Sequence, residues 1–192
     1  RINPLKSNTI QFLFSAFIII LIASTRLLPH TDNFVPVFAM ILFAAVHLKN
    51  KWQAILVSVG ALWLSDLYLN NWGRFAEYHN EFVLFASPFN YLSYILIALV
   101  SMQIFKKTIS LPKVFGSSLL VGVIFFIVSN FGVWMNPLYT KTLWMCYIDA
   151  IPFFRATLTS NILFSAILFG GYYLLQKDFR SLQLRHVQYS KF

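Results

Sequence analysis

The sequence has little of what a water-soluble enzyme needs. Of its 192 residues only 11% are charged, six are acidic, seven are glycine and one, Cys146, is a cysteine. A single cysteine excludes an internal disulfide and a cysteine-based metal cluster. The chain lacks a nucleophile elbow, a zinc-protease helix, a phosphate-binding glycine loop and a paired-carboxylate motif. We therefore expect a protein that is not an enzyme, binds no cofactor and does not use ATP by itself.

Apolar residues dominate what is there. Hydrophobic residues make up 58% of the chain and aromatic residues 18%, far above a soluble globular domain. Apolar runs near the length that a helix needs to cross a bilayer recur with short connections between them. We predict an all-α fold, one integral membrane domain over residues 1–192 with six transmembrane helices in the lipid bilayer. The expected spans are 8–25, 34–48, 54–70, 82–105, 114–135 and 153–175.

The first two apolar runs differ from the rest. The run at 8–25 follows basic residues and so resembles a signal peptide, but Arg26 and Pro29 stand where a small-residue cleavage site is needed, so we expect a retained span. The second run is the shortest, and Pro36 falls in its first turn, where a missing N–H breaks no hydrogen bond. A short, proline-interrupted span is one pointer to a binding site in transporters.

The distribution of basic residues predicts the orientation. One side of the expected bundle holds a single acid, Asp178, and eleven basic residues: Arg1, Lys6, Lys49, Lys51, Lys106, Lys107, Lys113, Lys177, Arg180, Arg185 and Lys191. The other side holds four basic residues and five acids. Because Lys and Arg accumulate in cytoplasmic loops, both termini are predicted to be cytoplasmic, in a multi-pass protein of a bacterial inner membrane. The net charge of +9 then reflects topology, and we expect no nucleic-acid partner.

Strongly polar residues of the predicted spans gather in their outward halves. Polar groups in the hydrocarbon region are costly unless paired, so their depth is informative. They lie level with the connection RLLPHTDNFVPV, residues 26–37, and together these segments would form a polar cup. The candidate substrate-binding residues are Arg26, His30, Asp66, Asn90, Asn130, Arg155 and Asn161.

Each candidate has two interpretations. Arg26 and Arg155 would attract an anionic group such as a carboxylate or phosphate. Alternatively, Asp66 forms an ion pair with one of these arginines and fastens two helices. The asparagines either supply donors and acceptors to a ligand or join helices by hydrogen bonds. The outward aromatic residues form either an interfacial belt or a stacking platform: Trp72, Trp134, Tyr139, Trp144 and Tyr147.

The candidate metal ligands, Cys146 and the C-terminal tail each also allow a functional and a purely structural interpretation. His30, Asp32, Asp66 and His79 are residue types that bind metals, but they lack a tight spacing such as a helical HxxxH, so no metal site is expected. Cys146 is either an axial ligand of a metal-containing cofactor or a small buried hydrophobe. The basic C-terminal tail either contacts anionic lipid or a cytoplasmic partner, or frays.

Four motifs carry a resemblance that covers nearly the whole chain. RLLPH…NF.PV, SDLYLN, NFGVW and CY…AIPFFR look like those of an uncharacterised family of small bacterial integral membrane proteins. That family in turn resembles the S components, the substrate-binding subunits of energy-coupling-factor vitamin transporters. The resemblance implies an S-component-like bundle that captures a vitamin-like solute at the outer face and joins a membrane coupling subunit with ATPases. The first span has no AxxxA stripe, which leaves open a specialised partner or none.

The sequence thus favours a substrate-binding membrane subunit for uptake of a small organic micronutrient. The alternative is a non-transporting structural or assembly subunit of a larger membrane complex, in which the polar residues fasten helices and the aromatic exterior contacts protein. A membrane enzyme would instead show turnover that depends on Asp66 or His30.

Overall fold

The fold is all-α over the residues that the computed structural model describes, which confirms the predicted class. Those residues are 13, 16–17, 19–21, 23–28, 33–48, 50–85, 87–106 and 108–189, with no side chains described for Lys51 and 175–189. Within these ranges no strand occurs. The elements are the 3-10 turn η1 (Thr25–Leu27), α2 (Val37–His47), α3 (Lys51–Asn71), the 3-10 turn η2 (Ala76–Tyr78), α4 (Pro88–Ile104), α5 (Leu111–Trp134), α6 (Leu143–Asp149) and α7 (Ile151–Tyr189).

Within the part of the chain that the structure describes, three helices are long and apolar enough to cross a membrane, judged by length and composition. They are Trp52–Asn71 within α3, Leu111–Trp134 within α5 and Ile151–Leu174 within α7. At 1.5 Å per residue these helices are about 30 to 36 Å long, which matches the thickness of the hydrocarbon layer. Large apolar side chains lie exposed on all three, as Leu56, Phe115 and Ile167 do. This outer surface suits lipid and not water, so the protein is a membrane protein.

Helix α2 lies at the centre of the bundle. Every residue from Val37 to Ala44 is at most 3% exposed, and the helix packs against α3, α4, α5 and α7. A helix that is apolar all round is one that other helices enclose. With 11 residues, α2 is about 16 Å long and too short to cross the hydrocarbon layer by itself. The helix begins only at Val37, after Pro36, and its first residues line a cavity at that end of the bundle.

Helix α4 begins at Pro88, later than the predicted start of the fourth span at residue 82. Proline disfavours a helical conformation in the residue before it, which explains the late start. The segment 79–85 is held along α3 instead. The Asn71 side chain donates to the carbonyl of Val83 and accepts from its N–H, both at 2.8 Å. The indole N–H of Trp63 donates to the carbonyl of Leu84 at 3.0 Å.

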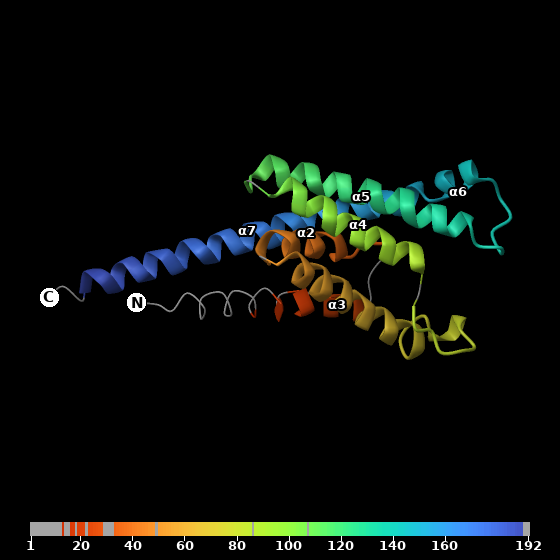
Figure 1. Cartoon of the computed structure of the whole chain (residues 1–192), viewed down its shortest axis with the longest axis horizontal. Coiled ribbons are helices and arrows are strands. Elements are labelled where there is room, and N and C mark those ends of the chain that lie inside the picture. The colour runs from red at the N-terminus through yellow and green to blue at the C-terminus, as the bar shows by residue number, and fades with distance from the viewer. Residues whose placement is uncertain are drawn as a thin grey trace.

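The C-terminal half also differs from the prediction at two places. Residues 143–149, predicted as part of a connection, form α6, and Thr142 Oγ1 accepts from the Met145 N–H at its start. Helix α7 continues to Tyr189, beyond the predicted end at 175, and extends away from the bundle (Figure 1). The α3–α4 and α5–α6 connections lie at the opposite end of the molecule from the end of α7 (Figure 1).

Candidate functional site

A cavity of about 520 Å³ lies at the end of the bundle that carries the α3–α4 and α5–α6 connections. Its volume is in the range of small-molecule sites. The segment before α2 and the helices α2 to α7 all contribute to its wall. The charged and amide residues of the lining are Arg26, Asn33, Asp66, Asn70, Arg74, Asn90, Asn130 and Asp149.

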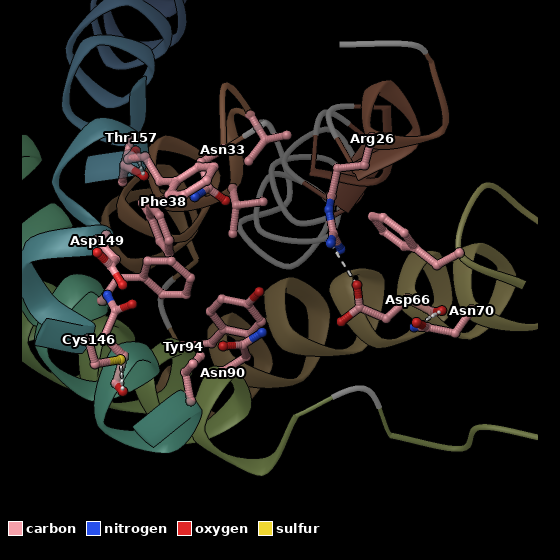
Figure 2. A pocket seen from close by; sticks show the side chains of 18 of the residues that line it. Arg26, Asn33, Phe38, Asp66, Asn70, Asn90, Tyr94, Cys146, Asp149 and Thr157 are labelled. Atoms are coloured by element: carbon pink, nitrogen blue, oxygen red, sulfur yellow. Dashed lines mark hydrogen bonds and ion pairs between the residues drawn. The ribbon is translucent and has the colours of Figure 1, made fainter. Parts of the chain in front are cut away.

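Four of the predicted site residues line this cavity. Arg26 comes from η1, Asp66 from α3, Asn90 from α4 and Asn130 from α5. Figure 2 shows Arg26 and Asp66 on one side, with Asn90 between them and the opposite wall of α6 and α7. The sequence indicated the depth of these residues along their helices. The structure adds that the helices are arranged so that the four meet.

Of the other three predicted residues, two are described and lie outside this lining. His30 lies outside the described residues. Arg155 is exposed on α7. Asn161 is fully buried, and its Nδ2 donates to the carbonyl of Ser118 at 3.4 Å, while Ser118 Oγ donates to Ser165 Oγ at 2.9 Å. Asn161 therefore sits in a polar contact between α5 and α7, which is the helix-joining interpretation given above.

Arg26 and Asp66 form an ion-paired cluster at one wall, in which only the Nε of Arg26 has no partner among the described residues. The Nη2 of Arg26 lies 2.6 Å from Asp66 Oδ1, and its Nη1 donates to Ser65 Oγ at 2.6 Å and to the carbonyl of Leu62 at 3.3 Å. The Tyr91 hydroxyl donates to Asp66 Oδ2 at 2.9 Å. The two charged side chains are only 12% and 9% exposed. The ion pair thus connects η1 to α3, and Tyr91 extends the connection to α4.

The remaining formal charges of the lining also have partners. Asp149 accepts from Lys141 Nζ at 2.6 Å, in a pair whose side chains are 56% and 46% exposed. The Arg74 guanidinium lies 4.9 Å from the centre of the Phe75 ring, a cation–π distance. Among the described residues, two arginines and two aspartates line the cavity, and their formal charges sum to zero.

Neutral polar groups face the cavity with spare hydrogen-bonding capacity. The side-chain amide of Asn90 has no partner among the described residues. Asn130 Nδ2 donates to the carbonyl of Phe126 at 2.8 Å, which leaves its Oδ1 as an acceptor. The buried Tyr139 hydroxyl likewise has no partner in the described part of the chain. Its burial, with Cys146 and Asp149 nearby, raises the pKa of Tyr139 to about 12, so the phenol is a donor at neutral pH.

An aromatic cluster underlies these groups. Phe38 at the start of α2, Tyr94 of α4 and Phe125 of α5 line the cavity, with ring centres 4.6 Å apart for Phe38 and Phe125 and 6.2 Å apart for the other two pairs. The sequence analysis did not identify this cluster. The available signal was the spacing of Asn90 and Tyr94, four residues apart, which places both on one face of α4.

The aromatic residues predicted on the outward side are interpreted as either an interfacial belt or a stacking platform, and the structure does not treat them all alike. Tyr139 lines the cavity. Three tryptophans are exposed, which favours the interfacial belt for them: Trp72 at 65%, Trp134 at 37% and Trp144 at 73%. Cys146 is buried in the lining with its Sγ 3.4 Å from the carbonyl oxygen of Asn130. Among the described residues no group of three or more His, Cys, Asp or Glu side chains is placed to hold a metal ion.

Fold and cavity together define an all-helical membrane protein with a mixed polar and aromatic cavity at one end. Residues 6–182 match DUF6580, a family of unknown function, and the chain belongs to that family. No curated protein matches the chain. No solved structure matches it either.

Proposed function

We propose that the protein is a substrate-binding membrane subunit for the uptake of a small, vitamin-like organic solute. The proposal retains the six predicted spans in the bacterial inner membrane, the second of which contains the short helix α2, together with cytoplasmic termini and a site in the outward half. The observation that supports it most is the cavity of about 520 Å³, where side chains distant in the sequence meet. The excess of basic residues predicted for the opposite side of the membrane supports an outward position for this cavity.

The state of the lining groups favours a ligand over simple packing. Polar groups away from bulk water usually have hydrogen-bond partners, and leaving them without one costs about 1 to 3 kcal/mol each. The Tyr139 hydroxyl is such a group. Asn90 and Asn130 are partly exposed, and they keep unused donors or acceptors at a cavity that has room for a small molecule. The Phe38, Tyr94 and Phe125 rings provide an apolar surface for the body of that molecule.

In this proposal the protein captures the solute, and energy for its release into the cell comes from elsewhere. A membrane coupling subunit with ATPases is the partner that the S-component resemblance implies. Because α2 is short and enclosed, its N-terminal end forms the base of the site instead of reaching the outer surface. The polar cavity therefore extends into the bundle without exposing backbone groups to lipid.

Retention of a bound metabolite tests the proposal. The full-length protein, purified gently, is examined by native mass spectrometry, and any released small molecule is identified. We expect one molecule per chain in the wild type and its loss in Asn90→Leu, which replaces the amide by an apolar group with the same number of heavy atoms. Gln103→Leu makes the same chemical change at an exposed position near the other end of α4 and should retain the molecule. A protein without ligand, or equal retention in both variants, contradicts the proposal.

The structural-subunit alternative has one observation in its favour. Arg155 and Thr159 lie exposed one turn apart on α7, within the stretch that is long enough to cross a membrane. A cation is costly at a lipid-facing position, and a partner protein would relieve that cost. Arg155→Ala separates the two functions. Loss of a stoichiometric protein partner favours the structural subunit, whereas the cavity proposal predicts that this variant keeps its metabolite.

A further inference from the structure

We infer that the solute held in the cavity carries no net charge and is recognised through neutral hydrogen-bonding groups over an aromatic surface. This inference rests on the proposed function and specifies its substrate class. It differs from the sequence-based expectation of an anionic group, because Arg155 lies outside the lining and the Arg26 cation is already paired with Asp66.

The described charged groups at the cavity leave little to attract an ion. Arg26 and Asp66 are paired at 2.6 Å in a largely buried cluster. Asp149 is paired with Lys141, and Arg74 lies against the Phe75 ring. A charged solute would have to displace one of these contacts or remain without a counter-charge. An uncompensated charge removed from water is among the most unfavourable changes in a protein.

Apart from the Nε of Arg26, which has no partner among the described residues although its cation is paired with Asp66, the lining groups with spare capacity are uncharged. Asn90 offers an amide donor and acceptor, Asn130 an acceptor, and Tyr139 a hydroxyl donor. Figure 2 shows Asn90 and Tyr94 together between the Asp66 wall and the Cys146 wall. Donors and acceptors side by side, next to aromatic rings, match a planar compound whose edge carries an amide, a lactam or ring nitrogens.

Three small probes that differ mainly in charge test this inference: benzamide, benzoate and benzamidinium. Their binding to the purified full-length protein is measured by saturation-transfer NMR titration. We expect benzamide to bind at least about tenfold more tightly than either ion, because neither ion finds a free counter-charge.

Two variants provide the internal control. Asn90→Asp introduces a negative charge at almost constant shape, so it should reverse the preference toward benzamidinium. Asn136→Asp introduces the same charge outside the lining, where the side-chain oxygen that accepts from the Leu138 N–H is retained. This variant should leave the benzamide preference of the wild type unchanged.

The outcomes separate this inference from the function on which it rests. Tighter binding of benzoate or benzamidinium by the wild type, or a charged co-purified metabolite, overturns the neutral class and leaves the uptake proposal standing. If none of the probes binds, the charge of the co-purified metabolite decides: an uncharged molecule supports the inference. If no probe binds and no metabolite is retained, the proposed function fails, and the inference fails with it.

Discussion

Two sets of polar residues line the same cavity, and they differ in how fully their hydrogen-bonding groups are satisfied within the protein. Around Arg26 and Asp66, charges and hydroxyls bind one another, and the cluster connects η1, α3 and α4. Around Asn90 and Asn130, amide groups retain unused bonding capacity beside an aromatic surface. The comparison teaches that the most polar residues of a membrane protein need not be its ligand-binding residues. Charge buried in a bundle first requires a counter-charge, and the neutral groups with spare capacity then remain for a solute.

The largest effect on stability should come from breaking the ion-paired cluster. Asp66→Ala leaves the Arg26 cation largely buried without its counter-charge, and we expect a loss of about 3 to 5 kcal/mol in the free energy of unfolding. Thermal unfolding in detergent measures it. Asp149→Ala breaks the exposed pair with Lys141 and should cost only about 0 to 1 kcal/mol. Equal effects of the two substitutions would show that the Arg26 cluster does not fasten the helices.

A smaller effect is expected where α4 and α5 approach each other near the amide groups. A Cβ added at Gly132 would lie 2.4 Å from Cγ of Phe89, the neighbour of Asn90, whereas a Cβ added at Gly116 on the same helix meets nothing within 4 Å. We expect Gly132→Ala to destabilise by about 1 to 3 kcal/mol. Gly116→Ala should be neutral or stabilising by up to about 1 kcal/mol. The same thermal unfolding assay compares them, and a harmless Gly132→Ala would contradict the packing described.

The segment before α4 provides a local test. Asn71 holds the 79–85 segment by two hydrogen bonds to the Val83 backbone. Asn71→Leu removes both, so exchange of the Val83 amide hydrogen should accelerate about tenfold or more, since each bond contributes about 1 kcal/mol. Hydrogen exchange followed by mass spectrometry measures this. The matched variant Asn80→Leu changes an exposed side chain in the same connection and should leave the Val83 rate unaltered.

The smallest effect concerns the proton of Tyr139. Its pKa is raised to about 12, so the ultraviolet phenolate signal that distinguishes the wild type from Tyr139→Phe should appear near pH 12. An ordinary tyrosine ionises near pH 10. Because the folded pKa lies above the unfolded one, the contribution of this group to stability is complete below pH 10 and declines as the pH rises toward 12. A difference signal centred near pH 10 would show that the hydroxyl is not buried.

Particular residues show how far the sequence could lead. The composition predicted an all-helical membrane protein, and the cost of polar groups in lipid indicated Asp66, Asn90 and Asn130 by their depth. The arrangement of the helices around α2 cannot be derived from the sequence pattern, so the sequence could not show which arginine pairs with Asp66. It also could not show that Arg155 points away from the bundle, because polar and apolar residues alternate around the whole circumference of α7 at 151–161. The sequence analysis did not identify the aromatic cluster of Phe38, Tyr94 and Phe125, because aromatic residues are abundant along the whole chain.

Ligand retention in two variants tests the difference between the two polar sets most directly. Asn90→Leu removes one open amide, and the double variant Arg26→Met/Asp66→Leu replaces the ion pair with apolar side chains of similar volume, a change that buried pairs often tolerate. Native mass spectrometry of both proteins reports the fraction that carries the co-purified small molecule. We predict that Asn90→Leu loses the molecule and that the double variant keeps it. Loss from a folded double variant, with retention in Asn90→Leu, would show that the ion pair is the binding group and contradict the account.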